Sequence, residues 1–168
     1  MKKKNHISQF KRHFENRWEF KQFPQNDIAQ DILTVEENWF NERSNDIEKV
    51  FDNTALSMER ESIQIALQNA KALKLTGGVL YLDKIPCAMT LATPISSDCI
   101  DVLFEKSLSF AAQNGAYAVI NNLFVQTCSQ YKYINREEDM GVEGLRHAKL
   151  SYKPELLLDK FFGKVIES

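Results

Sequence analysis

The first apolar stripe lies in a basic segment. Ile7, Phe10 and Phe14 stand at i, i+3 and i+7, with lysines and an arginine between and beside them. This spacing predicts a basic amphipathic helix that needs a partner surface, and Pro24 would end the segment. We therefore expect a basic helical arm over 1–23.

Two further helices are predicted before the chain changes character. One covers 27–40, and the other covers 59–75 and would end at Gly77-Gly78. Together they form a helical part over 24–76. Their apolar stripes are Ile28, Ile32, Val35 and Trp39 in the first, and Ile63, Ala66, Leu67, Ala70 and Leu73 in the second.

After residue 76 the apolar runs become short and alternate with turn residues, which is typical of strands. The predicted elements are strands over 79–82, 85–93 and 100–105, a helix over 115–128, a strand over 131–135, a helix over 144–152 and a last strand over 156–162. Asp83-Lys84 would close a hairpin between the first two strands. The order predicts one α/β domain over 1–168, in which 77–168 supplies a mixed sheet flanked by helices.

Charge is unevenly distributed along the 168 residues, although the net charge is only −2. Residues 1–23 carry seven Lys and Arg against two Glu, whereas residues 24–70 carry ten acids against three bases. The basic arm suits an anionic surface, or it is simply a solvated helix. No apolar run approaches the length of a membrane span and no secretory signal is present, so we expect a cytoplasmic protein, at most at the inner face of the membrane.

Cysteines and histidines give no metal or disulfide pattern. The three cysteines lack CxxC spacing, and Cys87 and Cys128 fall on apolar stripes, so they are interpreted as core thiols. His6, His13 and His147 show no metal-ligand spacing. We therefore expect no metal site.

Two places could carry chemistry near the third predicted strand. Alternation puts Asp101, Leu103 and Glu105 on one side, so Glu105 is a candidate base or ammonium ligand at the strand end, or a charge in solvent. Gly115-Ala116-Tyr117 opens the next helix. Such a turn can present backbone N–H groups to an anion, or it is only a tight turn.

A third candidate is the charged stretch before and within the helix over 144–152. Acids at 137–139 precede this helix and complement its dipole. Arg146 and Lys149 share a helix face with Lys153, and such a face can bind phosphate or carboxylate. The same cations can instead pair with nearby acids such as Glu143 on a solvated face.

The same stretch carries a resemblance to a known family. The matching residues are Tyr131-Lys132-Tyr133-Ile134-Asn135-Arg136-Glu137-Glu138-Asp139-Met140-Gly141, Gly144-Leu145-Arg146, Ala148-Lys149 and Ser151-Tyr152-Lys153-Pro154. Earlier matches are Lys3-Lys4-Asn5-His6-Ile7 with Phe10, Gly77-Gly78-Val79-Leu80, Glu105-Lys106, and Gly115-Ala116-Tyr117 with Ile120-Asn121. Nearly the whole chain resembles the family named for the C-terminal domain of phosphatidylglycerol lysyltransferases.

The resemblance implies a GNAT-type acyltransferase fold, and with it a reaction. Related Fem-type and lysyltransferase enzymes pass an aminoacyl group from aminoacyl-tRNA to a lipid headgroup or a peptide amine. The nucleophile attacks the activated carbonyl directly, with no covalent enzyme intermediate. The implied donor is aminoacyl-tRNA or acyl-CoA, with no tightly bound cofactor.

The resemblance also assigns roles to residues. Glu105 and Tyr152 would be catalytic. Glu105 would hold an amine or act as a base. Tyr152 would donate a proton, or it is instead a core tyrosine with no catalytic role. The donor and substrate would be bound by Gly115, Ala116, Tyr117, Asn135, Arg136, Glu137, Arg146 and Lys149.

Two departures from the family leave other functions open. Family members usually carry two such folds in tandem, so this chain resembles a lone second half that would pair with a first GNAT-like half or with itself. The acetyl-CoA loop pattern Gln/Arg-x-x-Gly-x-Gly/Ala is not met, since Ala112 and Tyr117 stand at key positions. The alternative is a catalytically silent half that binds a partner or an anionic membrane surface. RNA binding through 1–23 and 146–153 ranks last.

Overall fold

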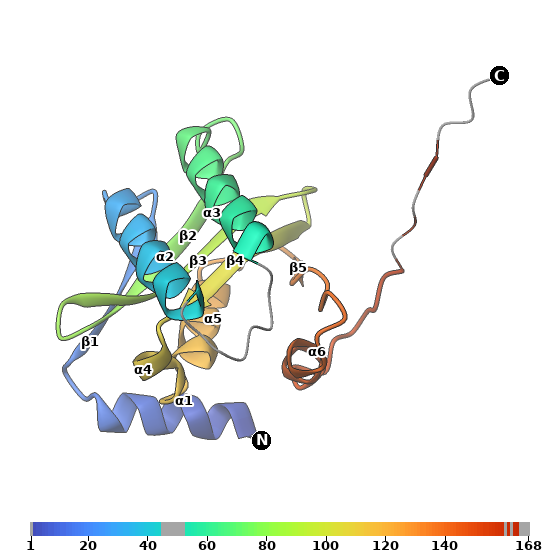
Figure 1. Cartoon of the computed structure of the whole chain (residues 1–168). Helices are drawn as coiled ribbons and strands as arrows, with labels where there is room; N and C mark the ends of the chain where they lie inside the picture. Colours follow the sequence, from blue (N-terminus) through green and yellow to red (C-terminus); the bar gives the residue numbers. More distant parts are fainter. Residues whose placement is uncertain (1, 45–52, 160, 162, 165–168) are drawn as a thin grey trace. The chain divides into compact units, whose positions relative to one another are not determined.

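The structure is a computed structural model that describes residues 2–44, 53–159, 161, 163 and 164. The chain forms two units, residues 1–135 and residues 136–168. The first unit holds the sheet and most of the helices (Figure 1).

A five-stranded mixed sheet forms the centre of the first unit, with the strands in sequence order across it. The strands are β1 (Trp18–Phe23), β2 (Thr76–Leu82), β3 (Ile85–Pro94), β4 (Cys99–Ser107) and β5 (Tyr133–Asn135). The first four pair antiparallel, and β5 pairs parallel to β4 after a helical crossover. The predicted antiparallel front and crossover at the back are therefore confirmed.

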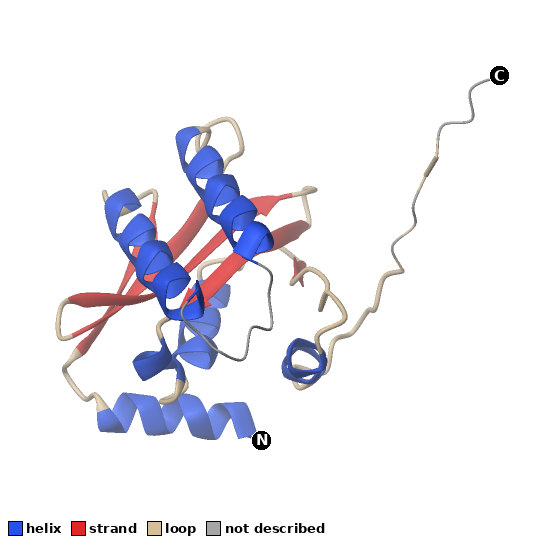
Figure 2. Cartoon of the chain, viewed as in Figure 1, coloured by secondary structure: helices blue, strands red, loops and turns tan. Residues whose placement is uncertain are grey.

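Helices cover both faces of this sheet (Figure 2). One face carries α2 (Ala29–Ser44) and α3 (Asn53–Gln68) over an apolar core that includes Ile32, Val35 and Ile63, all fully buried. The other face carries α1 (Lys2–His13), α4 (Ser109–Ala112) and α5 (Ala116–Gln126). Part of the polar stretch between the second and third predicted helices, 45–52, lies outside the described residues.

The basic arm is half helix and half strand. Phe10 of α1 and Phe14, the residue after this helix, are buried in the core beside α5, so the partner surface that the stripe needs is supplied by the chain itself. The prediction of a helical arm is wrong for Trp18–Phe23, which form β1. Trp18 and Phe20 alternate with polar residues and pack on the same core as α1, a period of two that favours a strand.

Gly77 and Gly78 also differ from the prediction. The third helix ends at Gln68, and both glycines lie inside β2. A Cβ on Gly77 would stand 2.1 Å from the Thr90 carbonyl oxygen, and one on Gly78 would stand 2.4 Å from the Phe20 ring. They are therefore positions of close approach between neighbouring strands rather than a helix stop.

The β2–β3 hairpin is confirmed. Asp83 and Lys84 both have positive φ, 51° and 69°, as a two-residue type I′ turn requires. Asp83 also receives two hydrogen bonds from the Arg17 guanidinium, at 2.8 and 2.5 Å, which ties the turn to the residue before β1.

A β-bulge interrupts β4. Leu91 of β3 pairs with Phe104, but the next residue, Ala92, pairs with Val102, so Leu103 is an extra residue. The bulge reverses the alternation of β4, because side chains after Leu103 point to the opposite faces from those that a regular strand would give them.

Both predicted core thiols of the first unit are buried. Burial raises the pKa of the Cys87 thiol to about 12 and also raises that of Cys128. Within the described ranges, no helix is long and apolar enough to cross a membrane, and no cluster of three His, Cys, Asp or Glu side chains could hold a metal.

The second unit contains α6 (Glu143–Leu150), which has no buried residue. The predicted last strand does not form: residues 156–159 and 161 lie outside any strand, and residues 160 and 162 are outside the described part. The described residues of this segment pair with no strand of the sheet.

Candidate functional site

The two parallel strands of the sheet separate early. β5 pairs only with Cys99–Asp101, and its last residue, Asn135, stands opposite Asp101. β4 continues for six more residues to Ser107. Among the described residues, β4 from Val102 to Ser107 therefore has no strand paired on its β5 side, and we call this unpaired edge the gap beside β4.

The chain turns from the end of β4 into α5 through Gly115. Gly115 has φ +91° and precedes the first residue of α5. Its carbonyl accepts hydrogen bonds from the Ala118 and Val119 amides, which begins the helix. A Cβ at Gly115 would stand 3.3 Å from His6 of α1, so glycine is required both by the left-handed backbone and by this contact.

Glu105 lies on the α5 face of the sheet, where its Oε2 accepts a hydrogen bond from the Asn121 amide at 3.1 Å. Leu103 packs on the core of the α2–α3 face instead. The prediction that Leu103 and Glu105 share one side is wrong, because the bulge at Leu103 lies between them. Glu105 is thus hydrogen-bonded to α5, the helix that follows Gly115.

Tyr117 lies close to Glu105. Burial raises the pKa of its phenol, and Trp39, the Ser107 backbone and Arg43, all close to the hydroxyl, lower it. Glu105 is near enough to raise the same pKa by its charge. The first unit thus contains both Glu105 and Tyr117, and the charge of Glu105 reaches the phenol of Tyr117.

Sequence reasoning missed a buried charged cluster on the opposite side of β4. The Lys106 ammonium is 2.7 Å from Glu59 and 3.3 Å from Glu36, and it lies 3.3 Å from the centre of the Trp39 ring. Lys106 and Glu36 are almost fully buried, with side chains 2% and 1% exposed. Burial raises the pKa of the Glu36 carboxyl, whereas the positive charge of Lys106 lowers it, and the effect of burial is the larger.

One signal in the sequence indicates this cluster. Glu36 follows Ile32 by four residues, so it falls on the apolar stripe of the second predicted helix. A carboxylate on a buried face needs a cation, and a lysine within an apolar strand is a matching partner.

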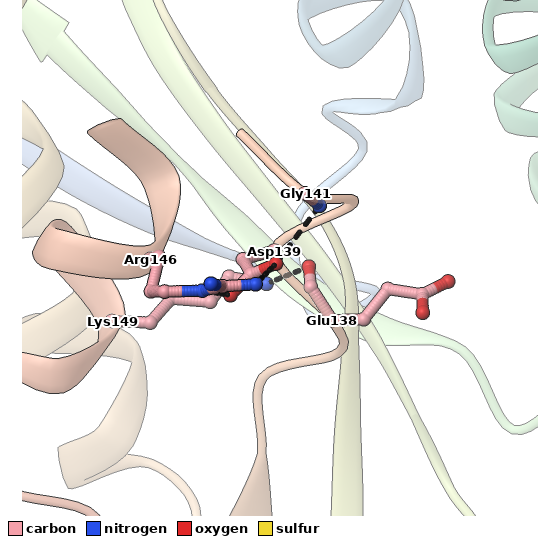
Figure 3. A network of polar contacts seen from close by, with 5 residues as sticks. All are labelled: Glu138, Asp139, Gly141, Arg146 and Lys149. Carbon is pink, nitrogen blue, oxygen red and sulfur yellow. Dashed lines mark hydrogen bonds and ion pairs between the residues drawn. The ribbon is translucent and has the colours of Figure 1, made fainter. Parts of the chain in front are cut away.

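The predicted residues of the second unit form a polar network (Figure 3). Arg146 binds Asp139 through its Nε at 2.6 Å, and the Gly141 amide donates to the same carboxylate at 2.9 Å. Lys149 donates to the carbonyls of Arg136 and Glu138, at 2.5 and 2.6 Å. Both cations therefore hold the loop before α6, and their predicted contact with an anion stays a prediction.

The remaining predicted residues of this unit are close to that network. The Arg136 guanidinium stacks over the Tyr152 ring at 4.3 Å, and Glu137 has a positive φ of 53° in the loop. The second unit therefore contains Arg136, Glu137, Arg146, Lys149 and Tyr152, whereas the first contains Glu105, Gly115, Ala116, Tyr117 and Asn135.

Solved structures define the class of this fold. A possible acetyltransferase from Clostridium difficile 630 matches 90% of this chain and 99% of its own, with a TM-score of 0.63 and 12% identity. The enzyme AAC(6')-Iy, solved with the bisubstrate analogue CoA-S-monomethyl-acetylneamine, matches 89% of this chain and 99% of its own, with a TM-score of 0.52 and 14% identity. The chain has the GNAT acyltransferase fold.

The family follows from the sequence. The chain belongs to the family described as phosphatidylglycerol lysyltransferase, C-terminal, which matches residues 1–162. A conserved protein of unknown function from Bacteroides thetaiotaomicron VPI-5482 shares 37% identity with it at a TM-score of 0.80, over 94% of this chain and 50% of that one. The chain thus spans about half the length of that relative. Among curated proteins, no sequence match was found.

Proposed function

We propose that this chain transfers an acyl or aminoacyl group from an activated donor, such as aminoacyl-tRNA or acyl-CoA, to an amine or hydroxyl acceptor. The observation that carries the proposal is the gap beside β4, where Glu105 stands and the Gly115 turn follows within the same unit. The fold and the family support it.

The proposed reaction is a direct displacement at a carbonyl. The acceptor nitrogen or oxygen attacks the carbonyl carbon of the donor, a new C–N or C–O bond forms, and the bond to the tRNA ribose oxygen or the CoA sulfur breaks. The proton lost by the nucleophile leaves through a base, and the leaving oxygen or sulfur takes up a proton. The reaction needs no oxidant or reductant.

Glu105 is the proposed base or ammonium ligand, because its carboxylate lies at the gap and is oriented by Asn121. Gly115, Ala116 and Tyr117 would meet the donor at the start of α5, where amide N–H groups favour an anion. Asn135, the last residue of β5, belongs to the same unit as Glu105. The roles in binding and proton transfer that the family resemblance assigns to Arg136, Glu137, Arg146, Lys149 and Tyr152, all in the second unit, stay predictions.

The donor is to be tested with the full chain and two probes. Acetyl-CoA and lysyl-tRNA are each titrated while the melting temperature is followed, since a ligand of the folded state raises it. Transfer is then measured to phosphatidylglycerol in vesicles and to a small primary amine. We expect one donor to bind and to transfer its acyl group.

Two glutamate variants make the test specific. Glu105→Gln should lower the transfer rate by about 10²–10⁴-fold, the usual contribution of a general base. The matched control, Glu61→Gln, changes an exposed glutamate of α3 and should leave the rate unchanged. Absence of binding and transfer with both donors would overturn the proposal, and equal rates for the two variants would remove Glu105 from it.

A second candidate function rests on α1. Its apolar side is buried in the chain's own core, while Arg12 and His13 are exposed in its last turn. We propose, as the alternative, that a catalytically silent chain docks on an anionic membrane by this basic face. Co-sedimentation with phosphatidylglycerol vesicles should then weaken as salt rises. Binding that persists at high salt, or no binding at all, would contradict it.

A further inference from the structure

The end of β4 is paired on one side only. Among the described residues, β3 pairs with β4 as far as Ser107, whereas β5 pairs with it no further than Asp101. Glu105, the proposed base, therefore lies at the gap beside β4, on a segment with one partner strand. Backbone pairing leaves such a segment freer to rotate than a strand paired on both sides, so its side-chain contacts decide how Glu105 is oriented.

Glu105 and Lys106 are consecutive residues of β4, and their side chains point to opposite faces of the sheet. Glu105 accepts a hydrogen bond from Asn121 on the α5 face, and Lys106 meets glutamates of α2 and α3 on the other face. Rotation of the strand about its own axis moves both side chains at once. Contacts that hold Lys106 therefore also hold Glu105.

The contacts of Lys106 fix its position. Its ammonium is 2.7 Å from Glu59, 3.3 Å from Glu36 and 3.3 Å from the centre of the Trp39 ring. Lys106 and Glu36 are almost fully buried, so withdrawal of the ammonium would leave the Glu36 carboxylate in the interior without its cation. The Trp39 ring adds a cation–π contact.

The helix α2 also holds the chain that follows β4. Trp39 packs with Leu108, the first residue after β4. Glu42 accepts hydrogen bonds from the Ser109 amide at 2.9 Å and from the Ser109 hydroxyl at 2.8 Å, at the start of α4. The helix α2 thus fixes the chain on both sides of the point where β4 ends.

We propose that Lys106 is a positioning residue for acyl transfer, which acts by holding the Glu105 carboxylate in its working orientation. The buried contacts of Lys106 with α2 and α3 fix the end of β4, and Glu105 moves with this end. The proposal gives Lys106 no contact with donor or acceptor and no part in proton transfer. The inference rests on the proposed function, because that function assigns Glu105 its role as base or ammonium ligand.

The test compares two variants that differ only at Lys106. Glu36→Gln neutralises the buried carboxylate and keeps the ammonium beside Glu59 and Trp39. Glu36→Gln with Lys106→Met also removes the ammonium, and this double variant is expected to fold because no buried charge is left unpaired. Circular dichroism and the melting temperature verify that both variants are folded.

The side-chain amide of Asn121 reports the position of Glu105 without any need for activity. Its NMR signals depend on the hydrogen bond that it donates to the Glu105 carboxylate, and Glu105→Ala shows them without that acceptor. Relative to Glu36→Gln, we expect the signals of the double variant to shift toward those of Glu105→Ala. Equal signals in the two variants would overturn the proposal, since Glu105 would then keep its place without Lys106.

Kinetics gives a second measurement, with the donor that the native chain uses. The double variant should have a kcat about 10²-fold below that of Glu36→Gln, the cost of misplacing a catalytic group by about 1 Å, while KM changes little. Equal kcat values would also overturn the proposal, because Lys106 would then serve stability alone. If the native chain transfers no acyl group, the proposed function fails, and the Asn121 signals still decide whether Lys106 holds Glu105.

Discussion

Each of the two units of this chain is stabilised internally by a different kind of contact. Residues 1–135 bury a continuous set of apolar side chains on both faces of a sheet. In residues 136–168 the helix α6 has no buried residue, and the described residues are joined by hydrogen bonds and an ion pair around Asp139 and Lys149. The first unit has the means to fold on its own, whereas the described residues of the second are held by local polar contacts.

Truncating one apolar side chain in each unit should give the largest difference in stability between the two units. Phe124→Ala removes a fully buried ring from the core beneath α5 and should cost about 3–5 kcal/mol. Leu150→Ala removes a side chain that is 47% exposed and should change stability by less than about 0.5 kcal/mol. Urea unfolding measures both. Similar costs would show that α6 is buried in the native protein.

Breaking one ion pair in each unit should give the next contrast. Lys106→Met leaves Glu36 buried without its cation and should cost about 3 kcal/mol, the lower end for a buried pair because Glu59 is partly exposed. Arg146→Met breaks an exposed pair and should leave global unfolding almost unchanged. Adding Glu36→Gln to Lys106→Met should recover part of the loss, and a failure to recover would exclude Glu36 as its cause.

Alanine in place of glycine should act with opposite signs in the two units. Gly77→Ala forces a Cβ against the Thr90 carbonyl and should destabilise the protein by about 1–3 kcal/mol. Gly144→Ala meets nothing within 4 Å and should stabilise α6 by about 0.5–1 kcal/mol. Urea unfolding reports the first effect and slower amide exchange in α6 the second. A neutral Gly77→Ala would contradict the close approach of β2 and β3.

The pH dependence of stability should report on the first unit. The pKa of the Glu36 carboxyl is raised in the folded state from its ordinary value of 4.5. Between pH 4.5 and the folded pKa, the folded protein therefore holds a proton that the unfolded chain has released. This contribution is fully present below pH 4.5 and is lost as pH rises through the folded pKa. Glu36→Gln should therefore flatten the fall in stability over that range, and an unchanged slope would assign it to other groups.

The smallest expected effect concerns the loop before α6. Lys149→Met removes the donor shared by the Arg136 and Glu138 carbonyls and should speed amide exchange over 136–141 without a change in global unfolding. Lys153→Met, an exposed lysine of the same unit, is the control. Equal exchange in both variants would show that Lys149 does not hold this loop.

Local signals predicted much of the fold. The hairpin was predicted from Asp83-Lys84, and α5 from the stripe that Ile120, Phe124 and Cys128 share, because each signal is contained within a few residues. β1 was missed, since its pairing partner lies some sixty residues away in β2 and only a short alternation marks it. The family resemblance identified the fold class.

The candidate site was predicted less completely. Glu105, Gly115 and Tyr117 were identified individually, but the face of the sheet on which Glu105 lies depends on the bulge at Leu103, which no local pattern indicates. The cluster of Glu36, Glu59 and Lys106 joins three elements that are far apart in sequence, so only tertiary structure brings it together. The roles of the predicted site residues stay predictions until the donor is known.

The extra residue Leu103 makes the length of β4 as important as its composition. If β4 ran past Leu103 as a regular strand, without the bulge, Glu105 would change faces with Lys106 and meet the two glutamates of α2 and α3, while a lysine would occupy the place beside Asn121. Deletion of Leu103 itself would make the pairing regular and leave both charges on their present faces, whereas loss of the bulge with Leu103 retained would invert the charge on both sides of the sheet. In variants of this chain, insertion of one residue into β4 after the bulge should therefore be far less tolerated than deletion of Leu103.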